Sequence, residues 1–128
     1  MADLEVRYRA YIDCLNRRDW TRLSDFVSEK VRYNGEKVGL AGYRGMLERD
    51  VYEIPDLRFG IGLLVVQPPH VAARLLFTCA PKGTFLGLPV NGRTVSFSEN
   101  VIYRFGAGGI EEVWSVIDKA AIQHQLFL

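Results

Sequence analysis

The spacing of the apolar residues changes at residue 57, and this change constrains the fold more than any other feature of the chain. Upstream, apolar side chains recur every three or four residues, which is typical of amphipathic helices. Downstream they alternate with polar ones, which is typical of strands that bury one face. Helices are predicted over 4–15, 20–27 and 43–51, and strands over 57–65, 71–79, 94–105 and 110–118. Helices followed by a long meander predict an α+β fold, in which the helices pack on one face of a curved antiparallel sheet.

The size and composition of the chain indicate a single domain, residues 1–128, with a core of its own. Its 48% of hydrophobic and 24% of charged residues exclude an intrinsically disordered chain. With a net charge of +1 and no run of Lys or Arg, the chain is expected to bind neither nucleic acid nor a membrane surface through charge. No window of the sequence reaches the roughly 20 apolar residues that a membrane-spanning helix needs.

Cysteine and histidine are scarce. The chain has two cysteines, Cys14 and Cys79. Because Met1–Glu5 lacks the basic and apolar regions of a secretion signal, we expect both to be free thiols in a reducing cytoplasm. His70 and His124 stand alone, and no cluster of Cys, His and carboxylates has metal-ligand spacing, so neither a metal nor any other cofactor is expected.

The last two predicted strands place carboxylates on an apolar face. If Gly106–Gly109 forms a four-residue loop, Phe105 lies opposite Ile110 and the pairing continues from there. One face then carries Phe97, Glu99, Val101, Tyr103, Trp114, Val116 and Asp118. This face is the more apolar, so we expect it to turn toward the helices and to bring Glu99 near Asp118. Buried carboxylates are costly unless they are paired, hydrogen-bonded or neutralised, which makes a small-molecule site the first hypothesis.

The opposite face of the same strands mixes serines with the apolar residues Ile102, Val113 and Ile117. A half-apolar sheet face often packs against a second copy of itself. We therefore expect a homodimer that forms through the outer sheet face.

Three stretches of the chain carry a resemblance to a known family. They read Phe85-Leu-Gly-Leu-Pro-Val-Asn-Gly-Arg-Thr-Val, Ile102-Tyr-Arg-Phe and Gly-Gly-Ile-Glu-Glu-Val-Trp-Ser-Val-Ile-Asp118. They are similar to motifs of the SnoaL-like polyketide cyclase and ester cyclase-like family, which belongs to the nuclear transport factor 2-like superfamily. Segments 11–20 and 54–59 fit the same pattern, so the resemblance covers nearly the whole chain.

The resemblance implies a cone-shaped, cystatin-like α+β barrel, often dimeric, whose pocket lies between a curved sheet and the N-terminal helices. Characterised cyclases of this kind close a polyketide ring by intramolecular aldol condensation without a cofactor. In them an aspartate at the end of the last long strand acts as acid and base, and Asp118 matches that position. The polyketide cyclases also place a histidine on the preceding strand, whereas this chain has none between residues 71 and 123 and offers Tyr103 or Glu99 instead.

Asp118 has two interpretations. In an apolar pocket its pKa would rise toward the working pH, which suits a general acid and base. Alternatively, it caps a helix that begins at Lys119. Glu99 is either a second pocket carboxylate or a structural group paired with an arginine or with the Tyr103 hydroxyl. The expected catalytic residues are Asp118, Glu99 and Tyr103.

The remaining candidates are apolar and aromatic residues that could form pocket walls. They are Trp114, Phe97, Val101, Val116, Trp20, Tyr43, Met46 and Phe85. Large aromatic residues also fill cores, so each could be structural instead. Segment 80–93, which contains Phe85, could be a lid over the pocket or a dimer contact.

Together these features predict cofactor-free acid/base chemistry on a small, mostly apolar carbonyl compound. Ring closure, isomerisation and dehydration would all use the same groups. The alternative is a non-catalytic module that binds a small hydrophobic ligand or serves only to dimerise.

Overall fold

The computed structural model describes residues 3–127 and has the predicted α+β architecture. Its helices are α1 (Leu4–Asn16), the short 3-10 helix η1 (Trp20–Asp25), α2 (Gly39–Glu53) and α3 (Lys119–Leu126). Its strands are β1 (Val27–Tyr33), β2 (Gly60–Gln67), β3 (His70–Cys79), β4 (Thr84–Phe85), β5 (Leu88–Pro89), β6 (Val95–Gly106) and β7 (Gly109–Ile117). None of the helices in the described part of the chain is long and apolar enough to span a membrane.

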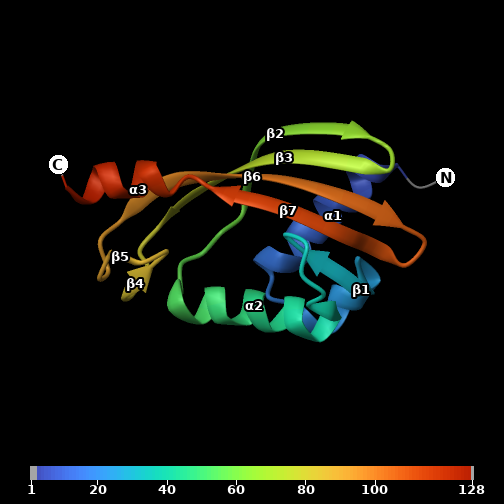
Figure 1. Ribbon diagram of the computed structural model, residues 1–128, viewed down its shortest axis with the longest axis horizontal. Coiled ribbons are helices and arrows are strands. Elements are labelled where there is room, and N and C mark those ends of the chain that lie inside the picture. The colour runs from blue at the N-terminus through green and yellow to red at the C-terminus, as the bar shows by residue number, and fades with distance from the viewer. Residues whose placement is uncertain (1–2, 128) are drawn as a thin grey trace.

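The main sheet has the strand order β1-β7-β6-β3-β2 and arches over α1 and α2, as Figure 1 shows. All neighbouring strands are antiparallel except β1 and β7, which are parallel. Strands β4 and β5 form a separate small hairpin beside the end of the sheet where β3 ends and β6 begins (Figure 1). The predicted fold class is therefore confirmed, with a curved sheet that stays unclosed.

The concave face of the sheet and the helices enclose the core. Along β3, every second residue is buried, and on β6 the buried series is Phe97, Val101, Tyr103 and Phe105. These side chains pack against Tyr8, Tyr11 and Leu15 of α1 and Tyr43 and Leu47 of α2. Burying one face of each strand against the amphipathic helices accounts for the alternation seen in the sequence.

The β6–β7 hairpin departs from the predicted pairing through a β-bulge. Phe105 lies opposite Ile110 as expected, but Arg104 lies opposite Glu112, so that Glu111 is an extra residue. The extra residue shifts the register by one and exchanges the two faces of β7. Val113, Ser115 and Ile117 therefore share the inner face with Tyr103, Val101 and Glu99.

Three placements expected on the inner face are consequently wrong. Trp114 and Val116 point outward, with 41% and 70% of their surface exposed. Asp118 is exposed at the end of β7, and its Oδ1 accepts a hydrogen bond from the Ala121 amide at 3.1 Å. Asp118 is thus the N-cap of α3, the alternative interpretation of this residue.

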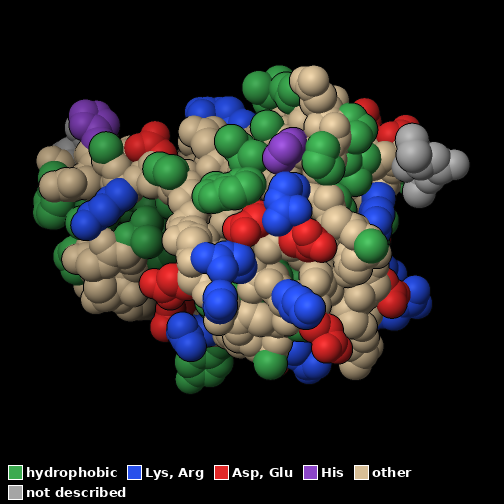
Figure 2. All heavy atoms as spheres, turned by 45° about the vertical axis from the view of Figure 1, so that its right-hand side comes forward, with side chains coloured by type: hydrophobic (Ala, Val, Ile, Leu, Met, Phe, Trp, Pro, Cys, Tyr) green, Lys and Arg blue, Asp and Glu red, His purple; other side chains and the backbone are tan. Residues whose placement is uncertain are grey.

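A second bulge at Gly62 has the same effect on β2. Ile61 pairs with Leu75 whereas Leu63 pairs with Arg74, so the predicted alternation reverses beyond Gly62. Leu63 and Val65 are exposed on the outer face of the sheet. On the face seen in Figure 2, apolar side chains gather toward the top of the view, where Figure 1 places β2 and β3. Below them, basic and acidic side chains are interspersed.

Candidate functional site

A cavity of about 240 Å³ opens between α2, the inner face of the sheet and the β4–β5 hairpin. Its walls are mostly apolar and include four phenylalanines, Phe59, Phe77, Phe85 and Phe97. The Phe77 and Phe97 rings stack with centroids 5.1 Å apart, and Phe59 meets Phe77 edge-on at 5.4 Å. Such walls favour flat, apolar molecules.

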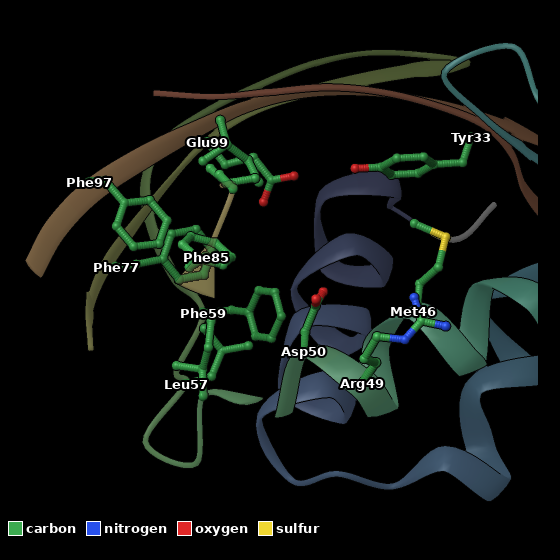
Figure 3. A pocket seen from close by; sticks show the side chains of 13 residues that line it. Tyr33, Met46, Arg49, Asp50, Leu57, Phe59, Phe77, Phe85, Phe97 and Glu99 are labelled. Carbon is green, nitrogen blue, oxygen red and sulfur yellow. The ribbon is translucent and has the colours of Figure 1, made fainter. Parts of the chain in front are cut away.

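Glu99 brings a carboxylate into this cavity from β6 (Figure 3). It sits between Leu75 and Ile117 on the inner face of the sheet. The Ser115 hydroxyl donates a hydrogen bond to Glu99 Oε2. Burial raises the pKa of Glu99, and the bond from Ser115 opposes that rise. A raised pKa makes this carboxylate a stronger base than one exposed to water.

Asp50 brings a second carboxylate from the facing wall, α2 (Figure 3). Burial and, after it, the negative charge of Glu99 raise the pKa of Asp50 to about 6, although Arg49 opposes the rise. Two carboxylates that titrate together in this way favour a state in which one is ionised and the other protonated. Near and below pH 6, Asp50 would therefore carry a proton while Glu99 is ionised, and the pair could accept one proton and donate another.

A smaller annex of about 60 Å³ lies deeper in the molecule. It shares Glu99, Asp50 and Tyr33 with the main cavity, and the tyrosines Tyr11, Tyr43 and Tyr103 line it as well. We call Tyr11, Tyr43 and Tyr103, together with Tyr8 behind Tyr103, the tyrosine cluster. Burial raises the pKa of every member of this cluster, so all four keep their hydroxyl hydrogens at ordinary pH.

Comparison with known proteins assigns the family. A family model for the SnoaL-like polyketide cyclases matches residues 5–126. The chain belongs to the SnoaL-like polyketide cyclase family.

Solved structures of similar proteins support the assignment. A SnoaL-like polyketide cyclase from Agrobacterium tumefaciens is 49% identical, with a TM-score of 0.97 over 98% of this chain and 99% of that one. TsrD from Streptomyces laurentii is 23% identical, with a TM-score of 0.84 over 98% of both chains. IdmH from Streptomyces antibioticus is 18% identical, with a TM-score of 0.84 over 99% of this chain and 100% of that one. The last two show a shared fold only, and no protein of curated function matches the chain.

Within this SnoaL-like fold, the residues predicted from the sequence fall into three groups. Glu99, Phe97, Met46 and Phe85 line the main cavity. Tyr43, Val101 and Tyr103 line the annex, which Glu99 and Met46 border too. The third group lies outside both spaces and consists of Trp20, Trp114, Val116 and Asp118. Of these, Trp20 borders a surface hollow with Leu40 and Arg44. On β7 the predicted end borders the cavity through Ile117, but the bulge turns Trp114 and Val116 to the outer face of the sheet.

Asp50 is the important residue that the sequence analysis missed. Asp50 follows Tyr43, Met46 and Leu47 at the spacing that puts all four on one helix face. A carboxylate on the apolar stripe of a helix is the same signal that singled out Glu99 on a strand.

Proposed function

We propose that this family member catalyses cofactor-free acid/base chemistry on a small, mostly apolar carbonyl compound. The observation that carries the proposal is the approach of Glu99 and Asp50 from facing walls of one aromatic cavity. Glu99 replaces Asp118 as the proposed base because Asp118 caps α3 outside the cavity. The aromatic walls would hold the carbon skeleton, and the two carboxyl groups would move protons.

In a ring closure the Glu99 carboxylate would remove a hydrogen from the carbon next to a ketone. The electron pair of that C–H bond forms an enolate, whose carbon attacks a second carbonyl carbon of the same molecule. A new C–C bond forms, and the oxygen of the attacked carbonyl takes the proton of Asp50. Glu99 ends protonated and Asp50 ionised, so proton exchange with solvent restores the pair without any oxidant or reductant. Isomerisation or dehydration would begin with the same proton removal.

The rival function is a non-catalytic module that binds a small hydrophobic ligand in the same cavity. 2-Tetralone, a bicyclic ketone with acidic hydrogens beside its carbonyl, separates the two. The enzyme reading predicts that the wild-type protein speeds exchange of the C1 hydrogens for deuterium in heavy water above the buffer rate, which proton NMR follows directly. Saturable binding of 2-tetralone with exchange at the buffer rate would instead establish the binding module.

The proposed assembly is a homodimer through the outer sheet face. Exposed apolar side chains cover this face on β2, β3, β6 and β7, namely Leu63, Val65, Leu76, Ile102, Trp114 and Val116. Arg74 and Asn100 lie between Leu63 and Val116, but Val65, Ile102 and Trp114 share one row across the sheet with Ala72. Exposed apolar side chains gathered on one face favour burial against a second copy. Its position on the convex side leaves the cavity on the concave side free.

The proposed location is the cytoplasm. Cys14 and Cys79 are both buried and unpaired. Free thiols persist most readily in a reducing compartment.

A further inference from the structure

The tyrosine cluster holds more hydroxyl hydrogens than the described protein groups can accept. The Tyr8 hydroxyl donates to the Tyr103 hydroxyl at 3.3 Å, and the Tyr11 and Tyr43 hydroxyls share one hydrogen bond of 2.6 Å. The cluster thus has four hydroxyl hydrogens, but within residues 3–127 it makes only two hydrogen bonds. The hydrogen on Tyr103, and the one on either Tyr11 or Tyr43, are left without an acceptor in this part of the chain.

Burial makes these free hydrogens costly. Tyr11, Tyr43 and Tyr103 are 1%, 5% and 3% exposed. An unmatched buried donor loses about 1–3 kcal/mol relative to a satisfied one, so buried donors nearly always have a partner. The partner must come from outside the protein, and the space in front of the three hydroxyl-bearing side chains is the annex.

The annex has room for such a partner and adjoins the proposed reaction site. Its volume of about 60 Å³ exceeds the roughly 10–15 Å³ that one water molecule requires. Tyr33, Met46, Phe59, Asp50 and Glu99 border both spaces, so a molecule in the main cavity can extend one polar group into the annex. The annex therefore adds tyrosine hydroxyl groups beside a cavity whose walls are mostly apolar.

We infer that the tyrosine cluster binds an oxygen acceptor of the ligand, a carbonyl or enolate oxygen, and so sets the orientation of the ligand's rings between the aromatic walls. The inference deepens the proposed function and rests on it for the enolate. With its oxygen among the tyrosines, a ketone would present the adjacent carbon toward Glu99, which borders both spaces. The site would thus select one- or two-ring ketones and phenols whose oxygen lies at one end of the molecule.

Two probes with the same carbon skeleton test the inference without any need for turnover. 2-Tetralone carries a carbonyl oxygen, and tetralin has none. We expect the wild-type protein to bind 2-tetralone about five- to tenfold more tightly than tetralin, which corresponds to one hydrogen bond. We also expect the infrared carbonyl stretch of ¹³C-labelled 2-tetralone to move to lower frequency on binding.

Variants locate the donor. Y103F should cancel most of the affinity difference and of the infrared shift, and Y43F should reduce both. Y52F is the matched control, because Tyr52 is 73% exposed on α2 and the cation–π contact with Lys82 needs only its ring. The thermal unfolding of each variant checks that it is folded, and the wild-type comparison of the two probes needs no variant at all.

Three results would each overturn the inference. Equal affinity for the two probes would show that water, rather than the ligand, satisfies the tyrosine hydroxyls. An infrared shift that Y103F leaves intact, or failure of both probes to bind, would also contradict it. If 2-tetralone shows the infrared shift but the protein does not speed hydrogen exchange, the tyrosine subsite stands and the proposed acid/base chemistry is wrong. If the protein speeds exchange but the infrared shift does not depend on the tyrosines, the chemistry stands and the subsite is wrong.

Discussion

Glu99 on β6 and Asp50 on α2 project into one aromatic cavity from facing walls, and the charge of Glu99 contributes to raising the pKa of Asp50 (Figure 3). The two residues are 49 positions apart in the sequence and come from different element types. They line the same cavity because α2 lies on the concave side of the sheet (Figure 1).

Replacement of Asp50 by Asn should stabilise the protein at neutral pH. The folded state holds the proton of Asp50 up to about pH 6, against a reference pKa of 3.8, so the free energy of unfolding falls as the pH rises through this window. D50N removes the buried charge, and we expect a gain of about 1–2 kcal/mol at pH 7, less than the full shift implies because solvent partly screens the group. The gain should fade toward pH 4. Urea unfolding at both pH values measures the gain, with E29Q at an exposed position of β1 as the control. A loss of stability of D50N at pH 7 would contradict the raised pKa of Asp50.

Asp118 should behave as a helix cap. Removing the bond from its side chain to the Ala121 amide, 3.1 Å long, should cost D118A about 1 kcal/mol of unfolding free energy. D118N should cost little, because Asn caps helices about as well as Asp. The difference between the two midpoints of urea unfolding checks this, and equal losses in both variants would mean that the carboxylate charge matters for another reason.

Gly109 should be hard to replace, because it begins β7 at the point where β1 approaches. Its φ is +109°, and an added Cβ would lie 2.5 Å from the Phe26 carbonyl oxygen, which accepts the Ile110 amide at 2.8 Å. We expect G109A to lose at least about 2 kcal/mol of stability. Its neighbour Gly108 is the control, since a Cβ there meets Ser28 Oγ at an ordinary 3.5 Å. A small effect of G109A in urea unfolding would show that the β1–β7 contact can relax.

The proposed dimer makes the outer sheet face sensitive to charge. Val116 is 70% exposed in the single chain, and a carboxylate there would be buried without a partner in the interface. Sedimentation velocity should find a dimer for the wild type and a monomer for V116E, with the circular dichroism spectrum unchanged. A10E adds the same charge on the exposed side of α1 and should remain dimeric. A wild-type monomer at every concentration would end the dimer proposal.

Much of the fold and part of the site could be predicted from the sequence because they depend on periodicity. The alternation along β3 and β6 placed Glu99, Val101 and Tyr103 on the inner face, where the structure has them. The two bulges could not be predicted in this way, because one extra residue reverses every later position on the strand.

The bulge at Glu111 comes with side-chain contacts that only the three-dimensional structure reveals. The Glu111 carboxylate pairs with Arg104 at 2.7 Å and occupies the space over Gly106 where a larger residue would have its Cβ. Sequence alternation alone gives no sign of this packing. The same limit applies to the position of Asp50 across the cavity from Glu99, since a helix pattern indicates which face is buried but not which strand that face will contact.

The most direct test of the account compares E99Q with D118N in the exchange of the C1 hydrogens of 2-tetralone. Glutamine keeps the shape of Glu99 but cannot take a proton, whereas D118N keeps the helix cap. We predict that E99Q falls to the buffer rate, while D118N retains the wild-type rate. Full exchange by E99Q together with loss of exchange in D118N would contradict the account and return the acid/base role to the end of β7.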